Sequence, residues 1–179
     1  MPLGLLYTHH IEISESSQML KGRLQFFQEL LHFDLMDQPL DNFIQQNKYN
    51  FSDFKHELHH KQILAAIQEE RYFQPVNSAI DLCRFFMMEY KLPITFHDLK
   101  QLNLPLIFEN DHVYDQTGKV ASPNEFATRT QTNMSTSEGV HIFFFPKDFD
   151  MQNGLELLQA AGKMFCHIHG GEFKIKIHS

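Results

Sequence analysis

The chain has 179 residues, and its 22 acidic residues outnumber its 15 lysines and arginines, which gives a formal net charge of −7. This balance excludes a generally basic nucleic-acid-binding protein. With 42% hydrophobic and 21% charged residues, the composition is typical of a folded globular protein.

Membrane and secretory features are not expected in this sequence. Apolar runs such as residues 142–146 are far shorter than the roughly 20 residues that span a bilayer. The first residues lack the basic and apolar regions of a secretory signal. The two cysteines, Cys83 and Cys166, each lie in an apolar run, which favours reduced and buried thiols. We therefore expect a cytoplasmic protein without a membrane span.

The first part of the chain is predicted to be mainly helical. Apolar side chains recur at helical spacing in residues 17–33, after a serine that fits an N-cap, and this pattern predicts a helix. Residues 53–73 contain no glycine or proline and predict a second long helix. Residues 39–51, rich in asparagine and glutamine, indicate a short helix with turns. No strand is predicted before residue 78.

Short strands alternate with helices after residue 77. Residues 79–88 are dense in apolar side chains and fit either a buried strand or a buried helix. Residues 96–104 are predicted to form a short helix that Pro105 ends. Residues 106–114 predict a strand with a polar kink at 109–111, and a turn follows at 116–118.

The last fifty residues have the clearest local patterns. Strands are predicted at 126–132 and 139–145, an amphipathic helix at 155–168, and a half-buried strand at 172–178. The order of elements indicates an α+β fold, with a mainly helical segment at 1–77 packed on an α+β domain at 78–179.

Residues 78–179 resemble the C-terminal domain of ZipA, the bacterial division protein that binds FtsZ. The resemblance is strongest in residues 139–173, where a strand led by glycine and valine ends in proline. A short acidic loop, a helix with a central alanine and a Gly-Gly pair follow. The residues that match are Gly139, Val140, Pro146, Ala160 or Ala161, Gly170 and Gly171.

The resemblance implies a split β-α-β arrangement with an antiparallel sheet, helices on one face and an apolar groove on the other. In the family this groove receives the short C-terminal tail of FtsZ. A flexible peptide bound in such a groove must bury apolar anchors to offset its loss of conformational entropy. By their place in the pattern, Phe143, Phe145 and Val113 are expected to line the groove.

Two positions depart from the family pattern. Asp111 and Gln131 fall near positions where the family has apolar groove residues, and a carboxylate there would weaken an apolar site. The membrane anchor and long linker of the family are also replaced by the helical segment 1–77. One alternative is therefore a ZipA-fold relative with a repurposed groove, or with a groove filled by its own N-terminal helices.

The run His56-Glu57-Leu58-His59-His60 satisfies the H-E-x-x-H pattern. On a helix, His56 and His60 would share a face and could bind zinc, with Glu57 as the base that activates the metal-bound water. However, the flanking residues are polar, and the sequence offers no convincing third ligand. A zinc-dependent metallopeptidase is therefore the alternative to a binding protein.

No other motif indicates catalysis or a cofactor, since the chain contains no G-x-S-x-G, P-loop or G-x-G-x-x-G sequence. The sequence thus predicts a non-enzymatic protein without a cofactor that binds a short amphipathic peptide. The resemblance suggests the FtsZ tail as that peptide and a role as a cell-division adaptor. Nucleic acid is not an expected partner.

Overall fold

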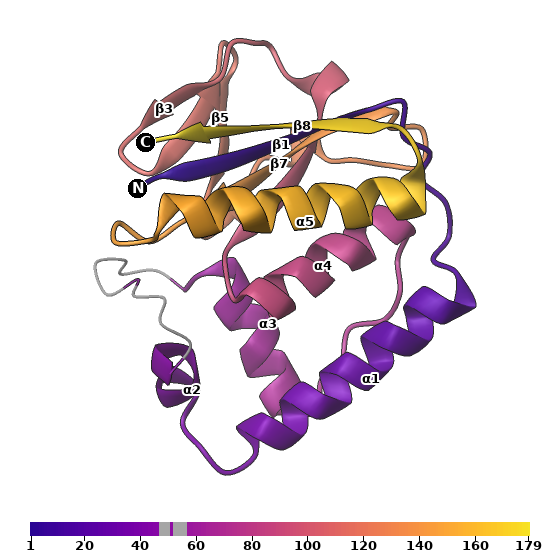
Figure 1. Ribbon diagram of the computed structural model, residues 1–179, viewed down its shortest axis with the longest axis vertical. Helices are drawn as coiled ribbons and strands as arrows, with labels where there is room; N and C mark the ends of the chain where they lie inside the picture. The colour runs from indigo at the N-terminus through magenta and orange to yellow at the C-terminus, as the bar shows by residue number, and fades with distance from the viewer. Residues whose placement is uncertain (47–50, 52–56) are drawn as a thin grey trace.

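A computed structural model describes residues 1–46, 51 and 57–179. It confirms an α+β fold with an N-terminal helical segment (Figure 1). The main sheet is antiparallel and has the strand order β2-β7-β1-β8. Its strands are β1 (Leu3–His9), β2 (Ile94–Asp98), β7 (Glu138–Phe144) and β8 (Glu172–His178).

Strand β1 was not expected from the sequence. It lies in the interior of the main sheet and pairs with β7 on one side and β8 on the other. The expected division between 1–77 and 78–179 therefore does not follow the fold, because the first residues supply a strand to the sheet of the second part.

Alternate residues of the central strands point into two different cores. In β7, Val140, Ile142 and Phe144 face one core, whereas Phe143 lies in the other. In β1, Leu5 and Leu6 are separated in the same way. Because both faces of the sheet are apolar here, the protein must cover both of them.

A small second sheet covers one face. It is a meander of four strands, β3 (Ile107–Glu109), β4 (His112–Asp115), β5 (Gly118–Ser122) and β6 (Glu125–Phe126). The predicted kink at 109–111 is the turn between β3 and β4, and the predicted turn at 116–118 joins β4 to β5. Two predictions are wrong here. Residues 96–104 begin in β2 and form only a short 3-10 helix at 99–101, and the strand expected at 126–132 ends at Phe126.

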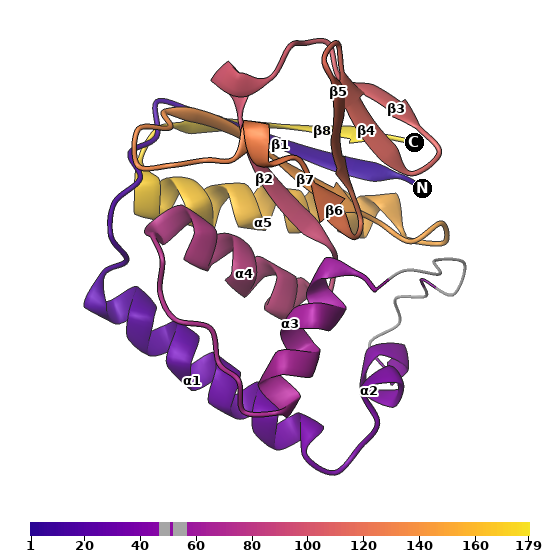
Figure 2. The same cartoon turned by 180° about the vertical axis from the view of Figure 1, so that it is seen from behind.

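Helices cover the other face in two layers (Figures 1 and 2). Helices α4 (Ser78–Tyr90) and α5 (Met151–His169) pack on the sheet, and α4 shows that residues 79–88 are helical. Helices α1 (Gln18–Leu35) and α3 (His59–Gln68) pack beyond α4, and α2 (Leu40–Gln46) follows α1. The predictions for 17–33, 155–168 and 172–178 are confirmed. The helix predicted at 53–73 is shorter, because α3 spans only His59–Gln68, and the part at 53–56 lies outside the described residues. Within the described chain, no helix has the combined length and apolar character to cross a membrane.

His60, His97 and His141 are completely buried in the folded protein. Burial lowers the pKa of His60 to about 3 and the pKa of His97 to about 3. Burial also holds the pKa of His141 well below its usual range. The His141 ring is stacked on Phe96 at a centroid distance of 3.9 Å, and Phe165 meets it edge-on at 4.7 Å. These rings therefore stay neutral in the native state at pH values where an unfolded chain would protonate them.

Stability should therefore fall as the pH falls below the usual histidine pKa of about 6.5, because the unfolded state then binds protons that the native state does not. Each such histidine contributes a slope of about 1.4 kcal/mol per pH unit between roughly pH 6 and 4. We expect His141→Leu to reduce the slope of the unfolding free energy against pH by that amount, measured by urea unfolding at several pH values. The neighbouring substitution Phe143→Leu should lower stability equally at every pH, and an unchanged slope in His141→Leu would contradict a neutral buried ring.

Candidate functional site

The predicted groove residues do not form an open groove. Phe143 and Phe145 are completely buried in the core on the helical face of the sheet. Val113 is completely buried in the other core, beneath the second sheet. The expectation of an exposed apolar sheet face at Phe143 is therefore wrong, because helices cover one face and residues of the second sheet cover the other.

The two polar positions of the predicted groove lie apart from each other. Asp111 is in the turn between β3 and β4, where its carboxylate pairs with the N-terminal ammonium group of Met1 at 2.8 Å. Gln131 is exposed and forms an isolated β-bridge with His97. Of the five predicted residues, only Gln131 lines the cleft described below.

The H-E-x-x-H pattern does not form the expected helical face. His56 lies outside the described residues, and α3 begins only at His59, so Glu57 precedes the helix. Glu57 is exposed, whereas His60 is completely buried and neither of its ring nitrogens has a hydrogen-bond partner. Among the described side chains, no group of three potential ligands is placed to hold a metal ion.

A cleft of about 350 Å³ is lined by residues of β2, of α4 and of the segment after β6. Its walls are mostly apolar, with a few polar groups among them. It is lined by His59, Val76, Ile80, Cys83, Arg84, Met87, Ile94, Thr95, Phe96, Phe126, Gln131 and Thr132. Apolar walls with a small number of convergent polar groups are typical of binding sites, so this cleft is the candidate site.

Strand β2 is the edge strand of the main sheet, and part of its outer edge opens into this cleft. The amide of Phe144 donates to the carbonyl of Pro93 at 3.1 Å, which sets the phase of the ladder between β2 and β7. Backbone groups alternate in direction along a strand. The N–H and C=O groups of Thr95 therefore point toward β7, and those of Ile94 point away from β7. No described strand pairs with β2 at Ile94, but the Cys83 thiol donates a weak hydrogen bond to the carbonyl of Ile94 at 4.0 Å. The bridge between His97 and Gln131 closes the other end of this edge.

The polar groups of the cleft include a thiol, an imidazole and a guanidinium group. Burial raises the pKa of the Cys83 thiol to about 12, so it is protonated near neutral pH. Burial lowers the pKa of His59. Arg84 lies over the Phe73 ring at 4.9 Å, and its Nη1 donates to the carbonyl of Gln74 at 3.3 Å. The same nitrogen lies 3.9 Å from the buried Asp81 carboxylate, so Arg84 is a positioned and partly compensated cation on a wall of the cleft.

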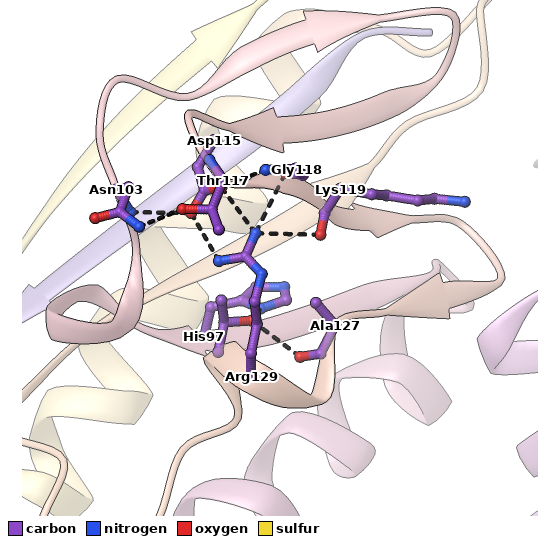
Figure 3. A network of polar contacts seen from close by, with 9 residues as sticks. His97, Asn103, Asp115, Thr117, Gly118, Lys119, Ala127 and Arg129 are labelled. Atoms are coloured by element: carbon purple, nitrogen blue, oxygen red, sulfur yellow. Dashed lines mark hydrogen bonds and ion pairs between the residues drawn. The ribbon is translucent and has the colours of Figure 1, made fainter.

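An ion pair holds the segment that forms the opposite wall (Figure 3). Arg129 donates through both terminal nitrogens to the buried Asp115 carboxylate, at 2.9 and 2.7 Å. The same carboxylate accepts hydrogen bonds from the amides of Asn103, Thr117 and Gly118. The hydrogen bonds from Arg129 hold the pKa of Asp115 well below its usual range. One carboxylate therefore ties the turn of the second sheet to the segment that leads to Gln131.

His97 ties the same segment to β2. Its two ring nitrogens lie 2.7 Å from the Thr130 hydroxyl and 2.9 Å from the Thr95 hydroxyl. The Thr130 hydroxyl also donates to the carbonyl of Ala127 at 3.0 Å. The wall at 130–132 is thus held from the main sheet and from the second sheet together.

The structure places residues around the cleft that the sequence did not single out. Arg84, Phe126 and the edge at Ile94 come from segments far apart in the chain. Pro93, which precedes β2, was a usable signal, because proline is tolerated at the start of an edge strand. No local pattern in the sequence indicates that Arg84 and Phe126 lie around the same cleft.

Replacing Arg129 with glutamine should weaken the wall of the cleft. The Asp115 carboxylate would lose its charged partner but keep its three backbone donors, so we expect a loss of about 1–3 kcal/mol in the free energy of unfolding at neutral pH. Because the low native pKa of Asp115 stabilises the fold above its unfolded pKa, this stabilisation disappears as the pH falls. In Arg129→Gln the pKa of Asp115 should rise, which a carboxyl carbon NMR titration measures. Lys119→Gln, which breaks the surface pair with Glu125, is the control and should change stability by less than about 1 kcal/mol.

Comparisons with known proteins leave the family undefined. No protein-family model matches the chain. The chain is similar to a protein of Bacillus subtilis (strain 168) described as uncharacterized protein YhzB. The two are 29% identical over 175 residues, which cover 90% of this chain and 84% of the Bacillus protein.

Proposed function

We propose that this protein is a non-enzymatic peptide-binding module that takes an extended segment of a partner protein along the outer edge of β2. One observation carries the proposal, namely that β2 is an edge strand of the main sheet and that Ile94, Thr95 and Phe96 of this strand line an apolar cleft. A bound segment would displace the contact of 4.0 Å between the Cys83 thiol and the carbonyl of Ile94. Strand addition uses this combination, because the edge supplies backbone hydrogen bonds and the cleft supplies specificity for side chains.

The dimensions and chemistry of the cleft suit a peptide. Its volume of about 350 Å³ is at the low end of the roughly 300–1,000 Å³ of ligand pockets, which favours one or two side chains over a large cofactor. Alternate residues of an added strand would point to one side, where Ile80, Met87 and Phe126 offer apolar surface. Arg84 favours an acidic residue in the partner.

The resemblance to ZipA suggests the FtsZ C-terminal tail as one peptide to test, with a role in cell division. Helix-in-groove binding on the sheet face is not part of the proposal, because both faces of the sheet contribute to buried cores. The proposal is instead that of a ZipA-like fold with a repurposed site, moved from the face of the sheet to its edge.

The experiment uses the full chain and two sources of peptide, the FtsZ tail and a displayed library of random peptides. Binding of the selected peptides is measured by fluorescence anisotropy and mapped by amide NMR shifts. We expect the shifts to concentrate at 94–96, at α4 and near Phe126. If the tail fails to bind and library peptides succeed, the division role is excluded but the binding function is supported. If no peptide binds at this edge, the proposed function fails.

Phe126→Ser should weaken peptide binding at least tenfold, because this exposed ring lines the cleft. Ile107→Ser is the matched control, since both side chains are 51% exposed and Ile107 does not line the cleft.

Two versions of the selected peptide test the binding mode. One is N-methylated at the odd-numbered amides and the other at the even-numbered amides. Only the version whose methyl groups block the backbone hydrogen bonds to β2 should lose binding. Equal effects of the two versions would contradict strand addition.

A further inference from the structure

The main sheet has a second edge strand, β8, on the side opposite to β2. Strand β8 pairs with β1 on one side, and no described strand pairs with its other side along its seven residues. In Figure 1 this strand lies in front of β1 and above α5. A long edge strand without proline is a template on which another chain can add a strand.

The hydrogen bonds of β1 determine which backbone groups of β8 face outward. The amide of Phe145 donates to the carbonyl of Pro2 at 3.0 Å, so the even-numbered residues of β1 direct their backbone groups toward β7. The odd-numbered residues of β1 therefore bond to the even-numbered residues of β8. Phe173, Ile175 and Ile177 are left to point their N–H and C=O groups outward. Within the described chain, these groups have no hydrogen-bond partner.

On the helical side of the sheet, the edge of β8 continues into a groove. The side chains of Phe173, Ile175 and Ile177 pack against the core on this side. The groove has a volume of about 420 Å³ and is lined by Leu155, Glu156, Gln159, Ala160, Lys163 and Ile175. Its one carboxylate and its one ammonium group balance each other in charge. Every second side chain of an added strand would point toward this groove, because side chains alternate between the two faces of a sheet.

On the opposite face, β8 presents two lysines. Lys174 and Lys176 are exposed, and neither has an ion-pair partner among the residues that the structure describes. Glu172 lies on the same face, with its carboxylate 3.6 Å from a ring nitrogen of His10. The two lysines are therefore uncompensated cations beside the open edge, in a protein whose net charge is −7. An acidic side chain directly opposite each lysine would form a favourable cross-strand pair.

The same lysines disfavour a second copy of β8 as the added strand. In an antiparallel pair of two β8 strands that bond through their outward groups, the twofold axis passes through residue 174, 175 or 176 when most of the strand is paired. These registers place Lys174 opposite Lys174, Lys174 opposite Lys176, or Lys176 opposite Lys176. Like charges directly opposite each other are destabilising, and edge lysines protect sheets from pairing with their own copies. The charge that repels a copy attracts an acidic strand.

We propose that the outer edge of β8 is a second docking surface, which takes an extended acidic segment of a partner protein as a fifth strand of the main sheet. Apolar side chains of this segment alternate with aspartate or glutamate. The apolar side chains enter the groove beside α5, and the carboxylates lie opposite Lys174 and Lys176. Strands β7 and β1 separate this edge from the cleft at β2, so the inference does not depend on the proposed function.

The charge preference is tested with a capped peptide as long as β8, seven residues, in which valine and glutamate alternate. Its binding to the full chain is measured by fluorescence anisotropy. A peptide with lysine in place of glutamate should bind at least about tenfold more weakly, because it repels the lysines of β8. The double variant Lys174→Glu with Lys176→Glu should reverse this preference. Lys21→Glu with Arg23→Glu changes the net charge equally on α1 and should leave the preference unchanged.

Binding of neither peptide at high micromolar concentration, or equal binding of both, would overturn the inference. Amide NMR shifts locate the bound glutamate peptide, and we expect them at 172–178 and along α5. Shifts confined to 94–96 and α4 would assign the peptide to the cleft at β2 instead, which would also overturn docking at β8.

The backbone mode is tested at Ile175, whose N–H points away from β1. Ile175→Pro removes this donor without removing a bond to β1, whereas Ile175→Ala shortens the side chain and keeps the donor. Urea unfolding checks that both variants fold. Ile175→Pro should bind the glutamate peptide at least about tenfold more weakly than Ile175→Ala, and equal binding would contradict strand addition. A wild type that sediments as a dimer, and becomes a monomer in Ile175→Pro, would show that a second copy occupies the edge and overturn the acidic partner.

Discussion

The insertion of β1 between β7 and β8 is the constraint on which the rest of the structure depends. It gives the main sheet two central strands whose alternate side chains are apolar on both faces, with Leu5 and Leu6 pointing into different cores. Neither face can be left in water without exposing a large apolar surface. The helices cover one apolar face of the sheet and the small meander covers the other, and this produces the layers of the molecule.

Covering both faces moves the possible binding surface from the face of the sheet to its edge. Among the described strands β2 pairs only with β7, and its outer side carries the bridge from His97 to Gln131 and the contact between Ile94 and the Cys83 thiol. The meander helps to build the site as well as covering the sheet, because Asp115 and Arg129 tie it to the segment that lines the cleft. The helical layer ends in α1, whose inner face completes the core while its outer face remains apolar.

The candidate site was only partly accessible from the sequence. Gln131 was singled out and does line the cleft, but Phe143, Phe145 and Val113 are buried. Strand alternation indicates that neighbouring phenylalanines face opposite sides of a sheet, yet it cannot tell whether another layer covers each side. In the same way, the spacing of the H-E-x-x-H pattern assumes one continuous helix, whereas α3 begins at His59, inside the pattern.

The sequence by itself determined the elements whose patterns are local. The helix from Gln18, the strand that begins at Glu138, helix α5 and the alternating strand β8 follow from periodicity, capping residues and the Gly170-Gly171 pair. Only the tertiary structure decided that β1 is a central strand, that residues 79–88 are helical and that the meander covers the sheet. The physical reason is the sequence separation of the interacting residues. Helical periodicity depends on residues three or four apart, whereas strand pairing and face coverage depend on segments more than a hundred residues apart in this chain.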